Sequence, residues 1–145
     1  MVRLRGARAA VAAAHKTMGG SVMEQQTGQL WSALREHTGP FFALREFESL
    51  LRLSVPDSTP PLNLGPTLIE WGGAQRWLKL PLRQAVDCAK MLGNVAGHAT
   101  IFRARDKSPG VFSALAPPLD RIHRELKKQF DPAGVFNRGR MFADF

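Results

Sequence analysis

Two short runs joined by a pair of glycines constrain the fold more than any other feature of the sequence. Residues 67–71 and 75–80 are predicted as strands, because they are rich in the apolar and aromatic residues that strands favour. Gly72 and Gly73 stand between the two runs, and a Gly-Gly pair at such a place is a good signal for the turn of a β-hairpin. The sequence therefore predicts an antiparallel pair of strands as the start of a sheet.

The remaining predicted elements are a mixture of strands and helices. Strands are predicted over residues 51–55, where apolar and polar residues alternate, over residues 98–103, and over residues 2–5. Helices are predicted over the Ala-rich residues 7–18, over residues 27–38, over residues 81–93 and over residues 119–130. Strands connected by a hairpin and by helical crossovers favour the α+β class, with an antiparallel β-sheet covered by helices on one face.

The C-terminal residues form a pattern of their own. The last predicted helix carries an apolar stripe of residues three and four apart, namely Leu119, Ile122, Leu126 and Phe130. Asp131-Pro132 ends that helix, because the residue before a proline avoids helical backbone angles, and Gly134 allows the chain to turn. We therefore expect Phe130, Val135 and Phe136 to fold back into a core. Asn137 and Arg140 should point outward from a second turn.

Composition and charge exclude several classes of protein. The 145 residues predict a single domain, and an apolar fraction of 44% is enough for a core. One cysteine, Cys88, excludes an internal disulfide and a cysteine-built metal site. No signal peptide or apolar run long enough for a membrane span is present, which favours a cytoplasmic protein. The net charge of +8 comes from scattered residues without a nucleic-acid motif, so no nucleic-acid partner is predicted.

Three stretches resemble one family. They are 69–77 (IEWGGAQRW), 97–103 (GHATIFR) and 130–140 (FDPAGVFNRGR). Together they resemble the FAD-linked oxidases of the vanillyl-alcohol-oxidase type, and among these the FAD-binding subunits of bacterial glycolate oxidases. Arg138 stands where the family pattern usually has proline. The family's N-terminal FAD-binding domain, with its Gly-rich loops, is expected to be absent, so the resemblance predicts a truncated subunit that consists of a C-terminal cap domain alone.

The resemblance implies a fold and a function. The fold would be a ferredoxin-like cap domain over the flavin. The complete family enzyme oxidises glycolate to glyoxylate with FAD, and its electrons pass to a second flavoprotein subunit and an iron–sulfur subunit. The enzyme would be cytoplasmic or, through its complex, peripheral to the inner membrane. This chain alone is expected to be inactive and to hold FAD weakly or not at all.

The same resemblance points to candidate site residues. Asn137, Gly139 and Arg140 would help to bind the cofactor, and the residues facing substrate or flavin would be Trp71, Arg76, His98 and Arg103. No catalytic residue and no metal ligand are predicted. In the simpler structural interpretation, Trp71 belongs to the core and both arginines are solvated. An alternative function is a stand-alone basic module that docks an acidic protein partner.

Overall fold

The structure is a computed structural model that describes residues 1–23, 26–92 and 97–142. The chain divides into two compact units, Met1–Pro40 and Phe41–Phe145. Both predicted helices of the first unit are present, as α1 (Arg8–Met18) and α2 (Thr27–Glu36). The predicted strand over residues 2–5 is wrong, since these residues have no regular secondary structure. Alternation alone does not supply a hydrogen-bonded neighbour, and the Arg3 guanidinium instead lies 4.8 Å from the ring centroid of Trp31.

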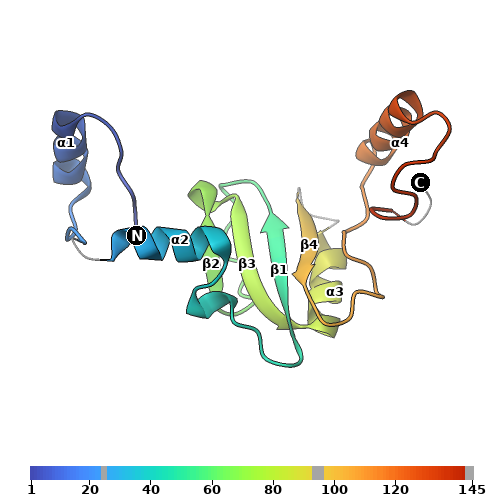
Figure 1. The fold of residues 1–145 in the computed structure, drawn as a ribbon, viewed down its shortest axis with the longest axis horizontal. Coiled ribbons are helices and arrows are strands. Elements are labelled where there is room, and N and C mark those ends of the chain that lie inside the picture. The colour runs from blue at the N-terminus through green and yellow to red at the C-terminus, as the bar shows by residue number, and fades with distance from the viewer. Residues whose placement is uncertain (24–25, 93–96, 143–145) are drawn as a thin grey trace. The chain divides into compact units, whose positions relative to one another are not determined.

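The second unit is built on a four-stranded sheet in the order β2-β3-β1-β4, shown in Figure 1. The strands are β1 (Glu48–Ser54), β2 (Thr67–Glu70), β3 (Gln75–Pro81) and β4 (His98–Arg103). Every neighbouring pair is antiparallel. The predicted hairpin is confirmed: β2 and β3 are joined by a single turn of 3-10 helix, η2 (Trp71–Gly73). Gly73 has φ +115°, and a Cβ there would lie 2.6 Å from the Asp57 carbonyl oxygen, so glycine is required.

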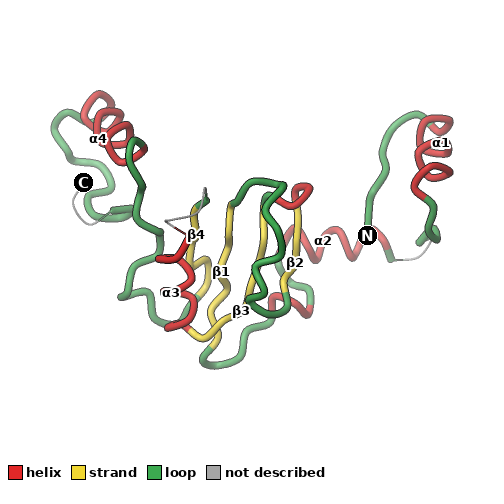
Figure 2. The backbone as a smooth tube through the Cα atoms, turned by 180° about the vertical axis from the view of Figure 1, so that it is seen from behind, coloured by secondary structure: helices red, strands yellow, loops and turns green. Residues whose placement is uncertain are grey.

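The main core lies between the sheet and α3 (Leu82–Leu92), which stands in front of the sheet in Figure 2. Pro81 precedes this helix, as the sequence predicts. The core is formed by apolar residues of three strands and the helix, among them Leu51, Leu53, Leu78, Ala85, Cys88 and Ile101. The α+β class with a helix-covered antiparallel sheet is therefore confirmed.

The C-terminal helix α4 (Leu119–Phe130) ends before Asp131-Pro132 as predicted, but its apolar stripe does not face a core. The side chains of Phe130, Val135 and Phe136 are 83%, 63% and 65% exposed, so the prediction that they are buried is wrong. Helical periodicity shows which side of a helix is apolar and does not supply the surface that covers it. The turn after α4 is held by polar contacts to Asp131 instead.

Candidate functional site

The strand register assigns the predicted site residues to two faces of the sheet. Leu53 faces α3, and its cross-strand partner Arg76 lies on the same face. The next residue of β1, Ser54, points the other way and is paired with His98. We call the face opposite α3 the far face; it carries Arg52, Ser54, Gln75, Trp77, His98, Thr100 and Phe102. Arg76 and His98, which the sequence groups together, are therefore on opposite faces.

Arg76 is buried and fully engaged by backbone carbonyls. Its side chain is 4% exposed. Nε donates to the Gly73 oxygen at 3.0 Å and Nη1 to the Pro60 oxygen at 2.8 Å, while Nη2 donates to the Thr59 oxygen. The guanidinium thus ties the loop before β2 to the β2–β3 turn, and the alternative in which Arg76 is solvated is wrong. Contact with a ligand would require it to give up these bonds.

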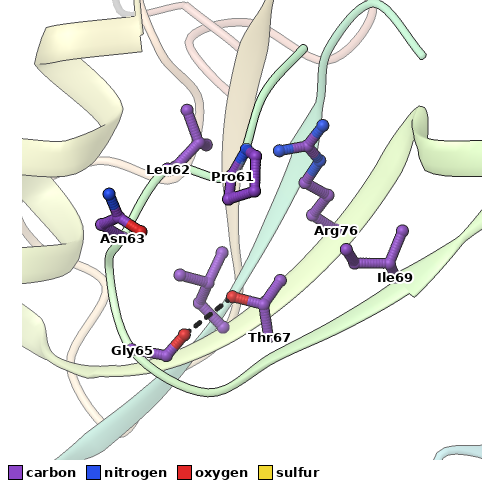
Figure 3. A pocket seen from close by; sticks show the side chains of 8 residues that line it. Pro61, Leu62, Asn63, Gly65, Thr67, Ile69 and Arg76 are labelled. Carbon is purple, nitrogen blue, oxygen red and sulfur yellow. Dashed lines mark hydrogen bonds between the residues drawn. The ribbon is translucent and has the colours of Figure 1, made fainter. Parts of the chain in front are cut away.

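A hollow beside Arg76 is shown in Figure 3. It has a volume of about 220 Å³ and is lined by the loop before β2 and by β2 and β3, with Leu62, Asn63 and Thr67 among its residues. The Thr67 hydroxyl donates to the Gly65 oxygen at 3.0 Å across its rim. Ligand sites for drug-sized molecules usually measure about 300 to 1,000 Å³. The hollow is therefore too small to enclose a flavin.

Trp71 and Arg103 lie at separate ends of the sheet. Trp71 is 78% exposed in the β2–β3 turn, so the alternative in which it belongs to the core is wrong. Arg103 is exposed at the end of β4, paired with Leu50, and its guanidinium carbon lies 5.9 Å from the Phe102 ring centroid. His98 is exposed at the opposite end of β4. The four residues therefore do not converge on one point.

Gly97, which precedes β4, allows close approach by the neighbouring strand β1. A Cβ at Gly97 would lie 2.7 Å from the Ser54 carbonyl oxygen and 3.0 Å from Val55 Cγ1. Any side chain would push β4 away from β1. Glycine at this position therefore sets where His98 stands on the far face.

The far face has an aromatic half. The Trp77 ring is 2% exposed and makes edge-to-face contacts with Phe42 at 5.8 Å and Phe102 at 5.1 Å between ring centroids. Trp77 Nε1 donates to Glu70 Oε2 at 2.7 Å, and Gln75 Nε2 donates to the same oxygen at 3.0 Å. These contacts fix the tryptophan, so the surface beside it is rigid.

The polar half of the far face is centred on Arg52. This residue lies in the inner strand β1, opposite Trp77 on one side and Thr100 on the other. Ser54 and His98 follow in the next row. A guanidinium, a hydroxyl and an imidazole thus lie in neighbouring rows of this half, and these groups are able to bind a small anion with its own hydroxyl group.

The residues predicted in the tail, Asn137, Gly139 and Arg140, are exposed. Asn137 has φ +50°, and its carbonyl accepts a hydrogen bond from the Arg140 amide at 3.1 Å, so the predicted second turn is present. Its outward display of Asn137 and Arg140 agrees with the sequence analysis. Whether these residues contact a cofactor stays a prediction.

Asp131 organises the turn that leads to these residues. Its carboxylate accepts a hydrogen bond from the Lys127 ammonium. It also accepts hydrogen bonds from the backbone N–H groups of Val135 at 3.0 Å and Phe136 at 2.9 Å. The hydrogen bond from Lys127, together with those two N–H groups, lowers the pKa of Asp131 to about 2. The Asp131 carboxylate thus stabilises the turn after α4, for which buried phenylalanines were predicted.

We expect the tail turn to lose order only in strong acid. Because the pKa of Asp131 is lower in the folded turn than its ordinary value of about 3.9, its contribution is complete above about pH 4 and is lost as the pH falls towards about 2. The carboxyl carbon of Asp131, followed by NMR, should titrate near pH 2, and the amide signals of Val135 and Phe136 should move with it. Lys127→Met should raise that midpoint. A midpoint near 3.9 in the unsubstituted chain would contradict the assigned contacts.

Other candidate chemistry is missing from the described residues. Cys88 is buried in the core, where burial raises the pKa of its thiol. In residues 1–23, 26–92 and 97–142, no three His, Cys, Asp or Glu side chains are grouped as a metal site would need. None of the helices described is long and apolar enough to cross a membrane.

One curated protein is similar to this chain along nearly its whole length. The chain is 44% identical over 144 residues to the glycolate oxidase subunit GlcE of Escherichia coli (strain K12). The chain is a relative of GlcE. The match covers 99% of this chain and 39% of the length of GlcE. No family model matches the chain, and no solved structure does.

The relation to GlcE confirms the resemblance that the sequence analysis based on three stretches. It extends over nearly the whole chain, including the first unit and β1. The alternating pattern predicts Arg52 only as an outward-facing residue of a half-buried strand, and Arg52 is not among the site residues predicted from the sequence. The available signal was its position as the one charged residue in that alternating run, Leu51-Arg52-Leu53-Ser54-Val55.

Proposed function

We propose that this chain forms the C-terminal cap part of a glycolate oxidase subunit and that its far face is turned towards a flavin-binding domain. The observation that carries the proposal is the 44% identity to GlcE over 99% of the chain. The sheet supports it, because one face is occupied by α3 while the other carries the polar side chains of Arg52, Ser54 and His98. Residues 1–145 would act together as this cap.

The proposed overall reaction is the oxidation of glycolate to glyoxylate. The carbon that bears the hydroxyl loses a hydride and the hydroxyl loses a proton. FAD, when bound to a complete subunit, would supply the acceptor for the hydride. A second flavoprotein subunit and an iron–sulfur subunit would then take up the electrons.

The described residues do not fit FAD by themselves. The hollow beside Arg76 is too small to enclose a flavin. The Arg76 guanidinium already donates hydrogen bonds to three carbonyl oxygens. We therefore assign this chain the task of forming one wall of the site rather than enclosing the cofactor. Its isolated form is expected to have no activity.

The predicted site residues take different parts in this proposal. His98 lies on the far face and is placed to meet substrate or flavin. Trp71 and Arg103, at the ends of the sheet, would border the same surface. Asn137, Gly139 and Arg140 would contact the flavin-binding domain or the cofactor from the tail.

The proposal is tested with a hybrid subunit. The stretch of E. coli GlcE that aligns with this chain is replaced by residues 1–145, and the hybrid is expressed in a strain whose own GlcE has been removed. We expect glycolate-dependent reduction of a dye in extracts, because the residues that form the cap would be supplied intact. GlcE lacking the aligned stretch is the matched control and should give no activity.

A hybrid that is folded and abundant but inactive would contradict the proposed function. The stand-alone module would instead be favoured if the isolated chain bound an acidic protein tightly in moderate salt while the hybrid stayed inactive, because its basic charge would then be the feature that acts.

A further inference from the structure

We propose that Arg52 binds the carboxylate of the 2-hydroxy acid on the far face, where its strand is paired with the buried Trp77 on one side and with Thr100 on the other. This inference rests on the proposed function, and it assigns a binding residue that neither the sequence motifs nor the comparison with GlcE points to.

The backbone of Arg52 is fixed on both sides. β1 is an inner strand, hydrogen-bonded to β3 and β4. The neighbours of Arg52 along the strand, Leu51 and Leu53, are 0% exposed and packed in the core under α3. The arginine side chain must therefore leave the sheet on the far face, from a point that cannot shift without disturbing the core.

Within residues 1–23, 26–92 and 97–142, no side chain serves as counter-ion to Arg52. Its side chain is half-buried, yet among the described residues it makes no hydrogen bond and no ion pair. Glu70, the acid on the same face of β2, already accepts hydrogen bonds from Trp77 and Gln75. A half-buried guanidinium without a partner favours an anion at this place, because the anion replaces water that burial has removed.

The surroundings suit a small carboxylate with a hydroxyl group. The guanidinium fork matches the two oxygens of a carboxylate. Trp77, 2% exposed between Phe42 and Phe102 and bonded to Glu70, holds the strand next to Arg52 in place. On the other side the pair Ser54 and His98, one row along the strands, offers polar groups to the rest of the molecule.

The test uses the hybrid subunit with Arg52→Gln. We expect the KM for glycolate to rise roughly 10- to 100-fold, because hydrogen bonds to a charged group are lost. The inhibition constant of oxalate, a carboxylate without a transferable hydride, should rise by a similar factor. Arg52→Lys should restore part of the affinity, since the charge returns without the fork.

Arg83→Gln is the matched control, with the same change of charge on the exposed side of α3. It should leave the KM for glycolate unchanged. Thermal unfolding of all variants should be the same, which separates a loss of binding from a loss of folding.

A second measurement does not depend on turnover. Oxalate should protect Arg52 of the hybrid from modification by phenylglyoxal, as followed by mass spectrometry, and should not protect Arg83.

Unchanged KM and oxalate inhibition in Arg52→Gln, in an active hybrid, would overturn the inference and leave the proposed function standing. An inactive hybrid in which oxalate still protects Arg52 would sink the proposed function and keep the anion site, whereas no protection would overturn the site as well. Loss of FAD from Arg52→Gln with an unchanged KM would assign the arginine to the cofactor phosphates and would also overturn it.

Discussion

Arg76→Met is expected to lower the free energy of unfolding by roughly 2 to 4 kcal/mol. Methionine fills much of the same space but donates no hydrogen bond, so the carbonyl oxygens of Thr59, Pro60 and Gly73 lose their donor together. Buried acceptors without a partner cost more than the bond itself contributes. Urea unfolding of the isolated chain, followed by circular dichroism, measures the loss.

Two further variants separate geometry from charge. Arg76→Lys should recover only part of the stability, because one ammonium cannot reach three carbonyls that are arranged around a planar fork. Arg83→Met removes an arginine from the exposed surface of α3 and should change the free energy of unfolding by less than about 0.5 kcal/mol. Arg76→Met that unfolds like the unsubstituted chain, but abolishes activity in the hybrid, would show that Arg76 faces the substrate after all.

The secondary structure could be predicted where local chemistry decides it. The Gly72-Gly73 pair fixes a turn that permits one connection between β2 and β3, and Pro81 leads into α3. Residues 2–5 also alternate, yet they form no strand, because pairing depends on a neighbour that the local pattern does not contain. The apolar stripe of α4 shows the same limit for a helix. Its spacing correctly predicts the helix, but the spacing does not show which surface, if any, covers the stripe.

The candidate site was harder to predict, because the contacts that define it join residues far apart in the chain. Arg76 looks like a surface residue until the loop before β2 brings two carbonyl oxygens to its guanidinium. Arg52 looks like any outward residue of a strand until β3 and β4 place Trp77 and Thr100 beside it. Strand register, which decides both cases, follows from the whole sheet rather than from any one strand.

Two tryptophans of the hairpin differ in burial in a way that the sequence does not predict: Trp77 is buried and Trp71 is exposed. The second large expected effect on stability comes from the buried one. Trp77→Ala is expected to lower the free energy of unfolding by roughly 3 to 5 kcal/mol. The ring is 2% exposed between Phe42 and Phe102, so its removal leaves a cavity that rigid neighbours cannot close. Urea unfolding followed by far-ultraviolet circular dichroism is the suitable measurement, since it does not depend on tryptophan fluorescence.

Trp77→Phe and Trp71→Ala divide that loss into its causes. Trp77→Phe keeps most of the aromatic packing and removes the Nε1 donor, and Glu70 retains its bond from Gln75, so the cost should be about 1 to 2 kcal/mol. Trp71→Ala removes a ring that is 78% exposed and should cost less than about 0.5 kcal/mol. Equal losses of unfolding free energy from Trp77→Ala and Trp71→Ala would mean that the aromatic half of the far face is not packed as described. The strand that pairs with Arg52 would then not be held in place by that packing.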